Sequence, residues 1–203
     1  MLNQLLQRVW SRSNPANALT HLSGQRNITV EPVTDSHVLT LIQRMMGAGK
    51  SNFGAVFSVR QATTDAAFNA YVRKRPNRKT LALWHDCPDG LRMLQPGGVT
   101  RTAVKGRQPF GQGIRFTDQF KQASLWPDSQ QRIVYGAICE VHLGNQLELT
   151  MHKPEQVTPL FLNSLDDHYD SVFVRQDNQL KTSEFIVYNP SQYTIRYLVQ
   201  INA

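Results

Sequence analysis

Three segments rich in β-branched and aromatic residues dominate the second half of the chain. They run from Arg132 to Leu143, from Glu184 to Tyr188 and from Thr194 to Ile201. Side chains of this kind favour β-strands, and such segments outnumber the helical patterns in this half. The sequence therefore predicts an α+β fold built on a largely antiparallel sheet.

The first half of the chain alternates between short strand patterns and helix patterns. Strands are predicted at residues 28–33, 53–59 and 80–84, and helices at about 38–46 and 64–73. Asp35 or Ser36 is expected to cap the first of these helices, and Gly47 to end it. Further helical segments are predicted at residues 1–10 and 118–125, and a polar connection at about 152–170.

Length and composition indicate one main domain. A chain of 203 residues fits an N-terminal arm, residues 1–27, followed by one folded domain, residues 28–203. The longest apolar stretches, such as Ile133–Cys139, fall short of the roughly 20 residues that cross a bilayer. The N-terminus lacks a secretory-signal pattern, and two cysteines cannot form a disulfide framework. We therefore expect a reducing compartment, either the cytoplasm or the cytosol of a target cell, and no membrane partner.

Positive charge is concentrated in the first part of the chain. Residues 1–110 hold fifteen Lys and Arg against five Asp and Glu, a net charge of +10, whereas the remainder is −3 and the whole chain is +7. The densest run comprises Arg73, Lys74, Arg75, Arg78 and Lys79. Such a cluster fits phosphate-bearing partners, such as nucleic acid or a dinucleotide, or else a solvated helix end.

Several common site motifs fail on their spacing. The segment 47–51 ends like a phosphate-binding loop, but the position that must be glycine is Arg44. Cys87 and Cys139 stand 52 residues apart among scattered histidines, so no metal site is predicted. Cys87 lies two residues after His85, yet no third residue that would orient a thiol nucleophile can be named, and no GxSxG elbow occurs.

Four separated segments contain residues that could bind a ligand or take part in catalysis. Along the chain they are LWHD at 83–86, FGQGIRFTD at 110–118, CEVHLGN at 139–145 and EFIVY at 184–188. His85, at the end of a strand, can hydrogen-bond a ribose hydroxyl, and a glycine-flanked loop lets its backbone approach a ligand closely. Glu184, which opens a strand, can stabilise a developing positive charge.

In order and spacing, these segments resemble the catalytic domain of the poly(ADP-ribose) polymerases, the diphtheria-toxin-like (H-Y-E) branch of the ADP-ribosyltransferases. In that family a strand ends in LWHG, a loop reads close to FGKGIYFAD, and later strands read GEVALGN and EYIVY. The resemblance covers about residues 28–201. It implies a mainly antiparallel, split β-sheet flanked by short helices. It also implies the transfer of ADP-ribose from NAD⁺ to a macromolecular acceptor, with release of nicotinamide.

The resemblance assigns roles to individual residues. His85 matches the histidine that holds the adenine-side ribose and orients NAD⁺. Glu184 matches the glutamate that hydrogen-bonds the nicotinamide ribose, supports the oxocarbenium-like transition state and helps to polarise the acceptor. Trp126 falls where the family has a tyrosine that stacks on nicotinamide. Gly113 and Phe116, both in the FGQGIRFTD segment, are included in the predicted NAD⁺ site.

Three further residues of the predicted NAD⁺ site depart from the family pattern. Asp86 replaces the glycine whose backbone binds the carboxamide of nicotinamide, and Ser124 lies one residue from the usual serine donor. Arg115 replaces a second tyrosine of the pocket wall, and is expected to stack as a planar cation or to contact a phosphate. These departures motivate an alternative, a catalytically degenerate interaction module of the same fold. A third reading is a plain basic nucleic-acid binder.

The acceptor stays open between protein and RNA or DNA, as does the choice between single transfer and chain elongation. The 27 residues ahead of the matching region leave no room for the family's helical regulatory domain. A small free-standing transferase of this kind fits a toxin or an effector, and the partner of a toxin would be an immunity (antitoxin) protein.

Overall fold

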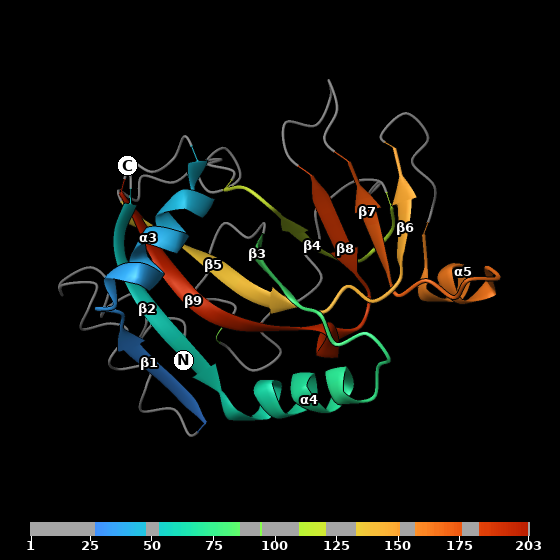
Figure 1. The fold of residues 1–203 in the computed structure, drawn as a ribbon, viewed down its shortest axis with the longest axis horizontal. Helices are drawn as coiled ribbons and strands as arrows, with labels where there is room; N and C mark the ends of the chain where they lie inside the picture. Colours follow the sequence, from blue (N-terminus) through green and yellow to red (C-terminus); the bar gives the residue numbers. More distant parts are fainter. Residues whose placement is uncertain are drawn as a thin grey trace, which may run out of the picture.

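The computed structural model describes residues 27–47, 53–85, 94, 110–120, 133–150, 157–175 and 183–202. Within them, nine strands form one hydrogen-bonded sheet in the order β1-β2-β9-β5-β3-β4-β8-β7-β6 (Figure 1). The strands are β1 (Ile28–Pro32), β2 (Phe53–Gln61), β3 (Leu81–His85), β4 (Ile114–Thr117), β5 (Ile133–Val141), β6 (Gln146–Leu149), β7 (Ser171–Val174), β8 (Glu184–Val187) and β9 (Tyr193–Asn202). The helices are α3 (Ser36–Met45), α4 (Ala62–Arg73), α5 (Pro159–Ser164) and the short 3-10 helix η4 (Pro190–Gln192).

The sheet consists of two groups of strands that meet at a narrow junction. One group is β1, β2, β9, β5 and β3, the other is β4, β8, β7 and β6, and they stand side by side in Figure 1. β3 and β4 join them through two residue pairs, Trp84 with Thr117 and His85 with Phe116. Neighbouring strands are antiparallel except β6 and β7. The α+β fold and the largely antiparallel sheet are therefore confirmed.

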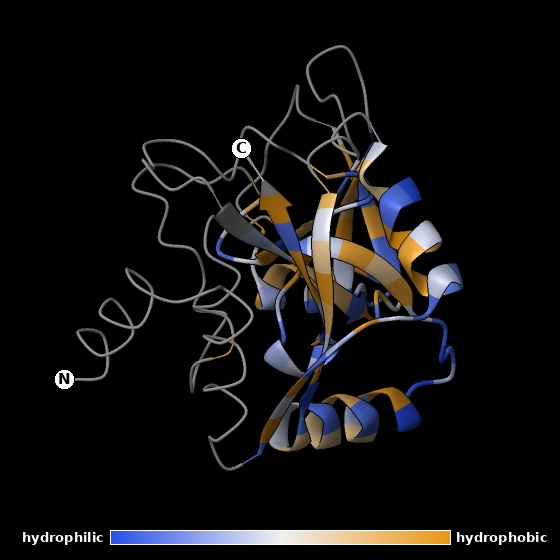
Figure 2. Cartoon of the chain, turned by 90° about the vertical axis from the view of Figure 1, so that its left-hand side faces the viewer, coloured by the Kyte–Doolittle hydropathy of each residue, from blue (hydrophilic) through white to orange (hydrophobic). Residues whose placement is uncertain are grey.

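Helix α3 covers one face of the first group of strands. Asp35 caps it by accepting hydrogen bonds from the backbone of His37 (2.8 Å) and Val38 (3.3 Å), and Gly47, with φ of +54°, follows its end. The side chains beneath it form an apolar cluster of Ile42, Met46, Val56, Trp84, Ile138, Val199 and Ile201. Trp84 Nε1 also donates to the carbonyl of Met45 at 3.0 Å. In Figure 2 hydrophobic residues are concentrated on the strands, and the outward side of α3 is largely hydrophilic.

Helix α4 follows β2 directly and packs beside η4 and β9 (Figure 1). Phe68, which is buried, is its main apolar contact. Among the helices of the described residues, none is long and apolar enough to cross a membrane.

The structure contains five elements that the sequence patterns did not predict: strands β4, β6 and β7, helix α5 and the 3-10 helix η4. Strands β4, β6 and β7 have four residues each, which is too short for an alternating pattern to be distinctive. Helix α5 interrupts the segment predicted to be a polar connection; it has six residues, a proline in its first turn and Thr158 as its cap. Residues 118–120 are not helical, contrary to the prediction for 118–125, and the rest of that segment, like the helix predicted at 1–10, lies outside the described residues.

Candidate active site

The structure brings Arg115 and Glu184 together at the junction of the two strand groups. On β4 and β8, Thr117 pairs with Glu184 and Arg115 pairs with Ile186. Residues two apart on a strand share a face, so the Arg115 and Glu184 side chains project to the same side. The guanidinium Nη1 lies 3.0 Å from the carboxylate Oε2, and the two side chains are 19% and 10% exposed. The result is a largely buried ion pair.

His85 lies at the end of β3 and is almost fully buried, with 5% of its surface exposed. Its ring meets the Phe116 ring edge-on, at 5.3 Å between centroids. Neither ring nitrogen has a hydrogen-bond partner in the part of the chain that the structure describes. Burial lowers the pKa of the imidazole to about 4. At neutral pH the ring is therefore uncharged and carries one hydrogen-bond donor and one acceptor, both buried.

His85 and Glu184 lie one step apart in the strand register. Thr117 pairs with both Trp84 and Glu184, whereas Phe116 pairs with both His85 and Phe185. Paired residues on neighbouring strands share a face of the sheet, and successive residues along a strand alternate between faces. The His85 and Glu184 side chains therefore project from opposite faces of the sheet. The structure therefore places both predicted catalytic residues at the junction, but it does not bring their side chains into contact.

The glycine-flanked loop before β4 is held tightly against β8. Phe110 has a positive φ of 65°, is fully buried, and accepts a hydrogen bond from the Tyr188 hydroxyl at 2.7 Å. A Cβ on Gly113 would collide with the Ile186 side chain and lie 3.1 Å from Tyr188 Cε1. A Cβ on Gly111 would collide with the carbonyl of Val157. Packing alone therefore requires glycine at 113, and its predicted contact with a ligand stays a prediction.

Phe116 has a structural position in addition to its predicted place in the site. Its ring is fully buried between the rings of His85 and Tyr193, 5.3 and 5.5 Å away between centroids. The Phe116 ring therefore packs against the His85 imidazole and fixes its orientation. The remaining predicted contacts to NAD⁺, Asp86, Ser124 and Trp126, lie outside the described residues, as does Cys87.

Sequence reasoning missed two features of this site. Arg115 was expected to stack or to contact a phosphate, whereas the structure pairs it with Glu184. Tyr188 was not singled out, although positions 184, 186 and 188 follow the alternation of a strand and would have placed Tyr188 on the Glu184 side. Burial raises the pKa of Tyr188, so its hydroxyl keeps the proton that it donates to Phe110.

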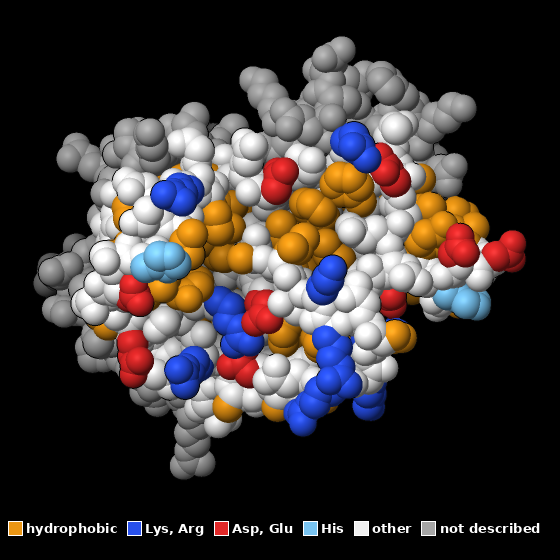
Figure 3. Space-filling model, in the orientation of Figure 1, with side chains coloured by type: hydrophobic (Ala, Val, Ile, Leu, Met, Phe, Trp, Pro, Cys, Tyr) orange, Lys and Arg blue, Asp and Glu red, His pale blue; other side chains and the backbone are white. Residues whose placement is uncertain are grey.

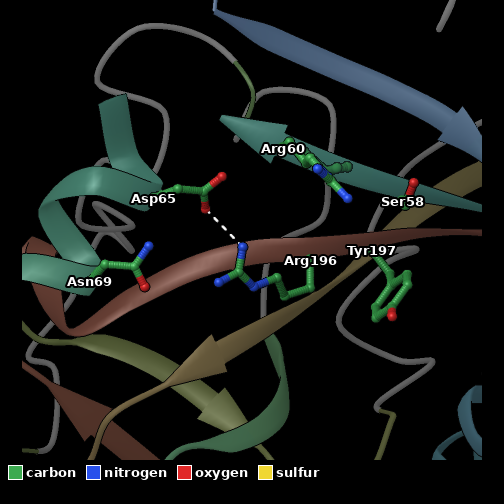
Figure 4. A pocket seen from close by; sticks show the side chains of 7 residues that line it. Ser58, Arg60, Asp65, Asn69, Arg196 and Tyr197 are labelled. Carbon is green, nitrogen blue, oxygen red and sulfur yellow. Dashed lines mark hydrogen bonds and ion pairs between the residues drawn. The ribbon is translucent and has the colours of Figure 1, made fainter. Parts of the chain in front are cut away.

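A separate pocket of about 390 Å³ lies between β2, β9 and α4 (Figure 4). It is lined by Ser58, Val59, Arg60, Asp65, Asn69, Arg196 and Tyr197, none of which belongs to the predicted site. Arg196 is held by Asp65, at 2.9 Å, and by Glu140, at 2.8 Å. Two carboxylates thus compensate the Arg196 charge.

Comparison with known proteins identifies one informative relative. No protein-family profile matches the sequence. A protein of Invertebrate iridescent virus 6, named "Putative poly [ADP-ribose] polymerase-like 100L", is 26% identical over 156 residues, which cover 72% of this chain and 84% of the relative. The chain is thus similar over most of its length to a poly(ADP-ribose) polymerase-like protein, which confirms the resemblance indicated by its four sequence motifs.

Proposed function

We propose that the chain is a NAD⁺-dependent ADP-ribosyltransferase and that residues 28–203 form one catalytic domain with the ADP-ribosyltransferase fold. The position of Glu184 carries the proposal. Its carboxylate opens a strand whose four residues are all buried. Burial of a carboxylate costs free energy unless the group is paired, and here Arg115 supplies the pair. A buried ion pair contributes little more to stability than apolar residues of similar size, so a glutamate at this position is better explained by chemistry than by packing. The similarity to the viral polymerase-like protein supports the same function.

In the proposed reaction, the bond between the nicotinamide nitrogen and C1′ of its ribose breaks, and the electron pair leaves with nicotinamide. An acceptor nucleophile bonds to C1′ with inversion and loses its proton. Glu184 accepts a hydrogen bond from the nicotinamide ribose and stabilises the positive charge that develops on that sugar. Arg115, 3.0 Å from the carboxylate, holds it in a fixed position before the substrate binds.

His85 is proposed to bind the adenine-side ribose. A ribose hydroxyl both donates and accepts hydrogen bonds, and the neutral His85 ring offers one group of each kind. Because β3 ends at His85, a ligand that contacts both His85 and Glu184 would pass around the end of this strand. NAD⁺ has two riboses joined by a diphosphate, so the proposal assigns His85 and Glu184 to different riboses of one donor substrate.

The Arg115–Glu184 ion pair also favours a second candidate function. The guanidinium binds one oxygen of the carboxylate that the family resemblance assigns to the nicotinamide ribose, and so competes with the ribose for it. If this pair does not open, the chain would act as a catalytically degenerate interaction module. Release of nicotinamide separates the two candidates, because it reports cleavage of NAD⁺ whatever the acceptor is.

The test compares wild type with Glu184→Gln and with Glu148→Gln. Glu148 is a matched control, since it also forms an ion pair with an arginine, Arg175, but on an exposed surface. We expect wild type and Glu148→Gln to release nicotinamide from NAD⁺, and Glu184→Gln to lose at least a hundredfold in rate. Equal rates in all three proteins would refute the role of Glu184, and no release by any of them would favour the interaction module.

A further inference from the structure

Four cations form an exposed cluster where α4 ends and the chain turns towards β3. This cationic cluster consists of Arg73, Lys74, Arg78 and Lys79. Figure 3 shows Lys and Arg side chains gathered over this end of α4. Within the described structure, none of the four forms an ion pair, whereas the neighbouring Arg75 pairs with Asp170 at 3.4 Å. Among the described residues, no carboxylate therefore compensates the charge of the cluster.

The turn that carries these cations is held in place by polar contacts. His142 Nε2 donates to the carbonyl of Asn77 at 2.6 Å, and the Asn77 side chain accepts from the backbone of Lys79 at 3.0 Å. Thr80, at the end of the turn, donates to Glu140 at 2.9 Å. The cations are thus displayed on an ordered backbone, which reduces the entropy lost when a partner binds.

The helix dipole explains only part of the cluster. Cations are favoured in the last turn of a helix, which accounts for Arg73. The effect falls off within that turn, however, and Arg78 and Lys79 lie beyond the helix end at Arg73. The Arg78 guanidinium reaches back to the carbonyl of Arg73 at 3.5 Å, a neutral acceptor that does not compensate its charge. Neither the dipole nor this contact accounts for Lys79, so the surplus charge points to an external anion.

We propose that the cationic cluster binds the phosphodiester backbone of a nucleic acid. Several unpaired cations on one ordered surface match a polymer that presents a regular row of phosphates. A membrane surface usually requires apolar side chains that insert beside the basic residues. Close to the cluster, the described structure offers one such residue, Leu81, which is 47% exposed. Charge without an apolar face favours nucleic acid.

The cluster is distant from the candidate active site along the sheet. Arg75, beside the cluster, pairs with Asp170, which directly precedes β7. β7 and β8 are antiparallel, with Ser171 opposite Val187 and Val174 opposite Glu184. The cluster therefore lies towards the end of β8 that is remote from Glu184. Binding at the cluster does not depend on ADP-ribosyl transfer, and each is measured without the other.

The test is fluorescence anisotropy of a short labelled single-stranded RNA, without NAD⁺, at salt concentrations from 50 to 200 mM. The proteins are wild type, Arg78→Glu/Lys79→Glu, and Arg44→Glu/Arg60→Glu. The second pair is a matched control, because it changes the net charge equally and both arginines are exposed. Arg44 lies on α3, and Arg60 lies on β2 just before the start of α4, whereas the cluster lies at the other end of that helix. The milder Arg78→Gln/Lys79→Gln variant serves if charge reversal impairs folding.

Four phosphate contacts predict that the wild-type affinity falls about 50-fold over this salt range, from a slope of roughly 0.7 per contact. The Arg78→Glu/Lys79→Glu variant keeps two phosphate contacts, so its affinity for the RNA should fall about sevenfold over the same salt range. The control should retain the wild-type salt dependence. Equal affinities and salt slopes in all proteins would overturn the proposal, as would binding to anionic phosphatidylserine vesicles without binding to RNA.

Discussion

The burial of His85 has a measurable consequence for the pH dependence of folding. An exposed histidine titrates near pH 6.5, whereas burial lowers the pKa of His85 in the folded protein to about 4. Between these two values the unfolded chain binds a proton that the native protein does not bind. The free energy of unfolding therefore falls as the pH is lowered from about 6.5 to 4, and the His85 contribution is complete above pH 6.5.

The size of the effect follows from the gap between the two pKa values. About 1.4 kcal/mol for each pH unit, over a gap of roughly 2.5 units, gives about 3 kcal/mol in total. About 2 kcal/mol of this is lost by pH 5. Replacement by leucine removes the titrating group and also removes two buried nitrogens that lack hydrogen-bond partners. At pH 7.5 we therefore expect His85→Leu to be as stable as wild type or slightly more stable.

The assay is urea unfolding of wild type and His85→Leu at pH 7.5 and pH 5, with the free energy of unfolding compared at each pH. Other titrating groups contribute equally to both proteins and cancel in the comparison. Wild type should lose about 2 kcal/mol more than the variant on acidification. Identical losses would refute the conclusion that His85 is buried and neutral. The same variant should lose NAD⁺ binding, which separates a functional histidine from a structural one.

Three further predictions concern the site and its supports. Arg115→Met removes the guanidinium that lies 3.0 Å from the buried Glu184 carboxylate and should cost about 3 kcal/mol in urea unfolding, most of which Arg115→Met/Glu184→Gln should recover; additive losses would show that the pair is not coupled. Gly113→Ala should lower the melting temperature by several degrees, because the new methyl group meets Ile186, and an unchanged value would argue against this packing. Thr158→Ala removes the cap of α5 and should cost about 1 kcal/mol, whereas Thr158→Ser should be neutral; equal costs would exclude a capping role.

The parts of the fold that could be predicted are those with long, regular patterns, together with short strands rich in apolar and β-branched residues, β1, β3 and β8. Strands β2, β5 and β9 have nine or ten residues each, and Asp35 precedes an amphipathic helix, so their identity is visible locally. Strands β4, β6 and β7 have four residues each, and their conformation depends on neighbours that are distant in the sequence. Short strands of this kind are defined by tertiary pairing rather than by local propensity.

In the candidate site too, local sequence patterns could be predicted, whereas contacts that depend on tertiary pairing could not. The motif order placed His85 and Glu184 at strand ends, and the structure has them there. The ion pair with Arg115 could not be predicted, because it depends on the register in which Thr117 faces Glu184. The burial of His85 likewise depends on Phe116, whose strand was not predicted.

The most direct test of the proposed activity is the transfer of label from NAD⁺ with a tagged adenine. Wild type and Glu184→Gln are incubated with a cell lysate that is then separated into protein and nucleic-acid fractions. We expect label in one fraction with wild type and none with Glu184→Gln, which would also identify the class of acceptor. Equal labelling by both proteins, or none by wild type, would contradict ADP-ribosyl transfer through Glu184.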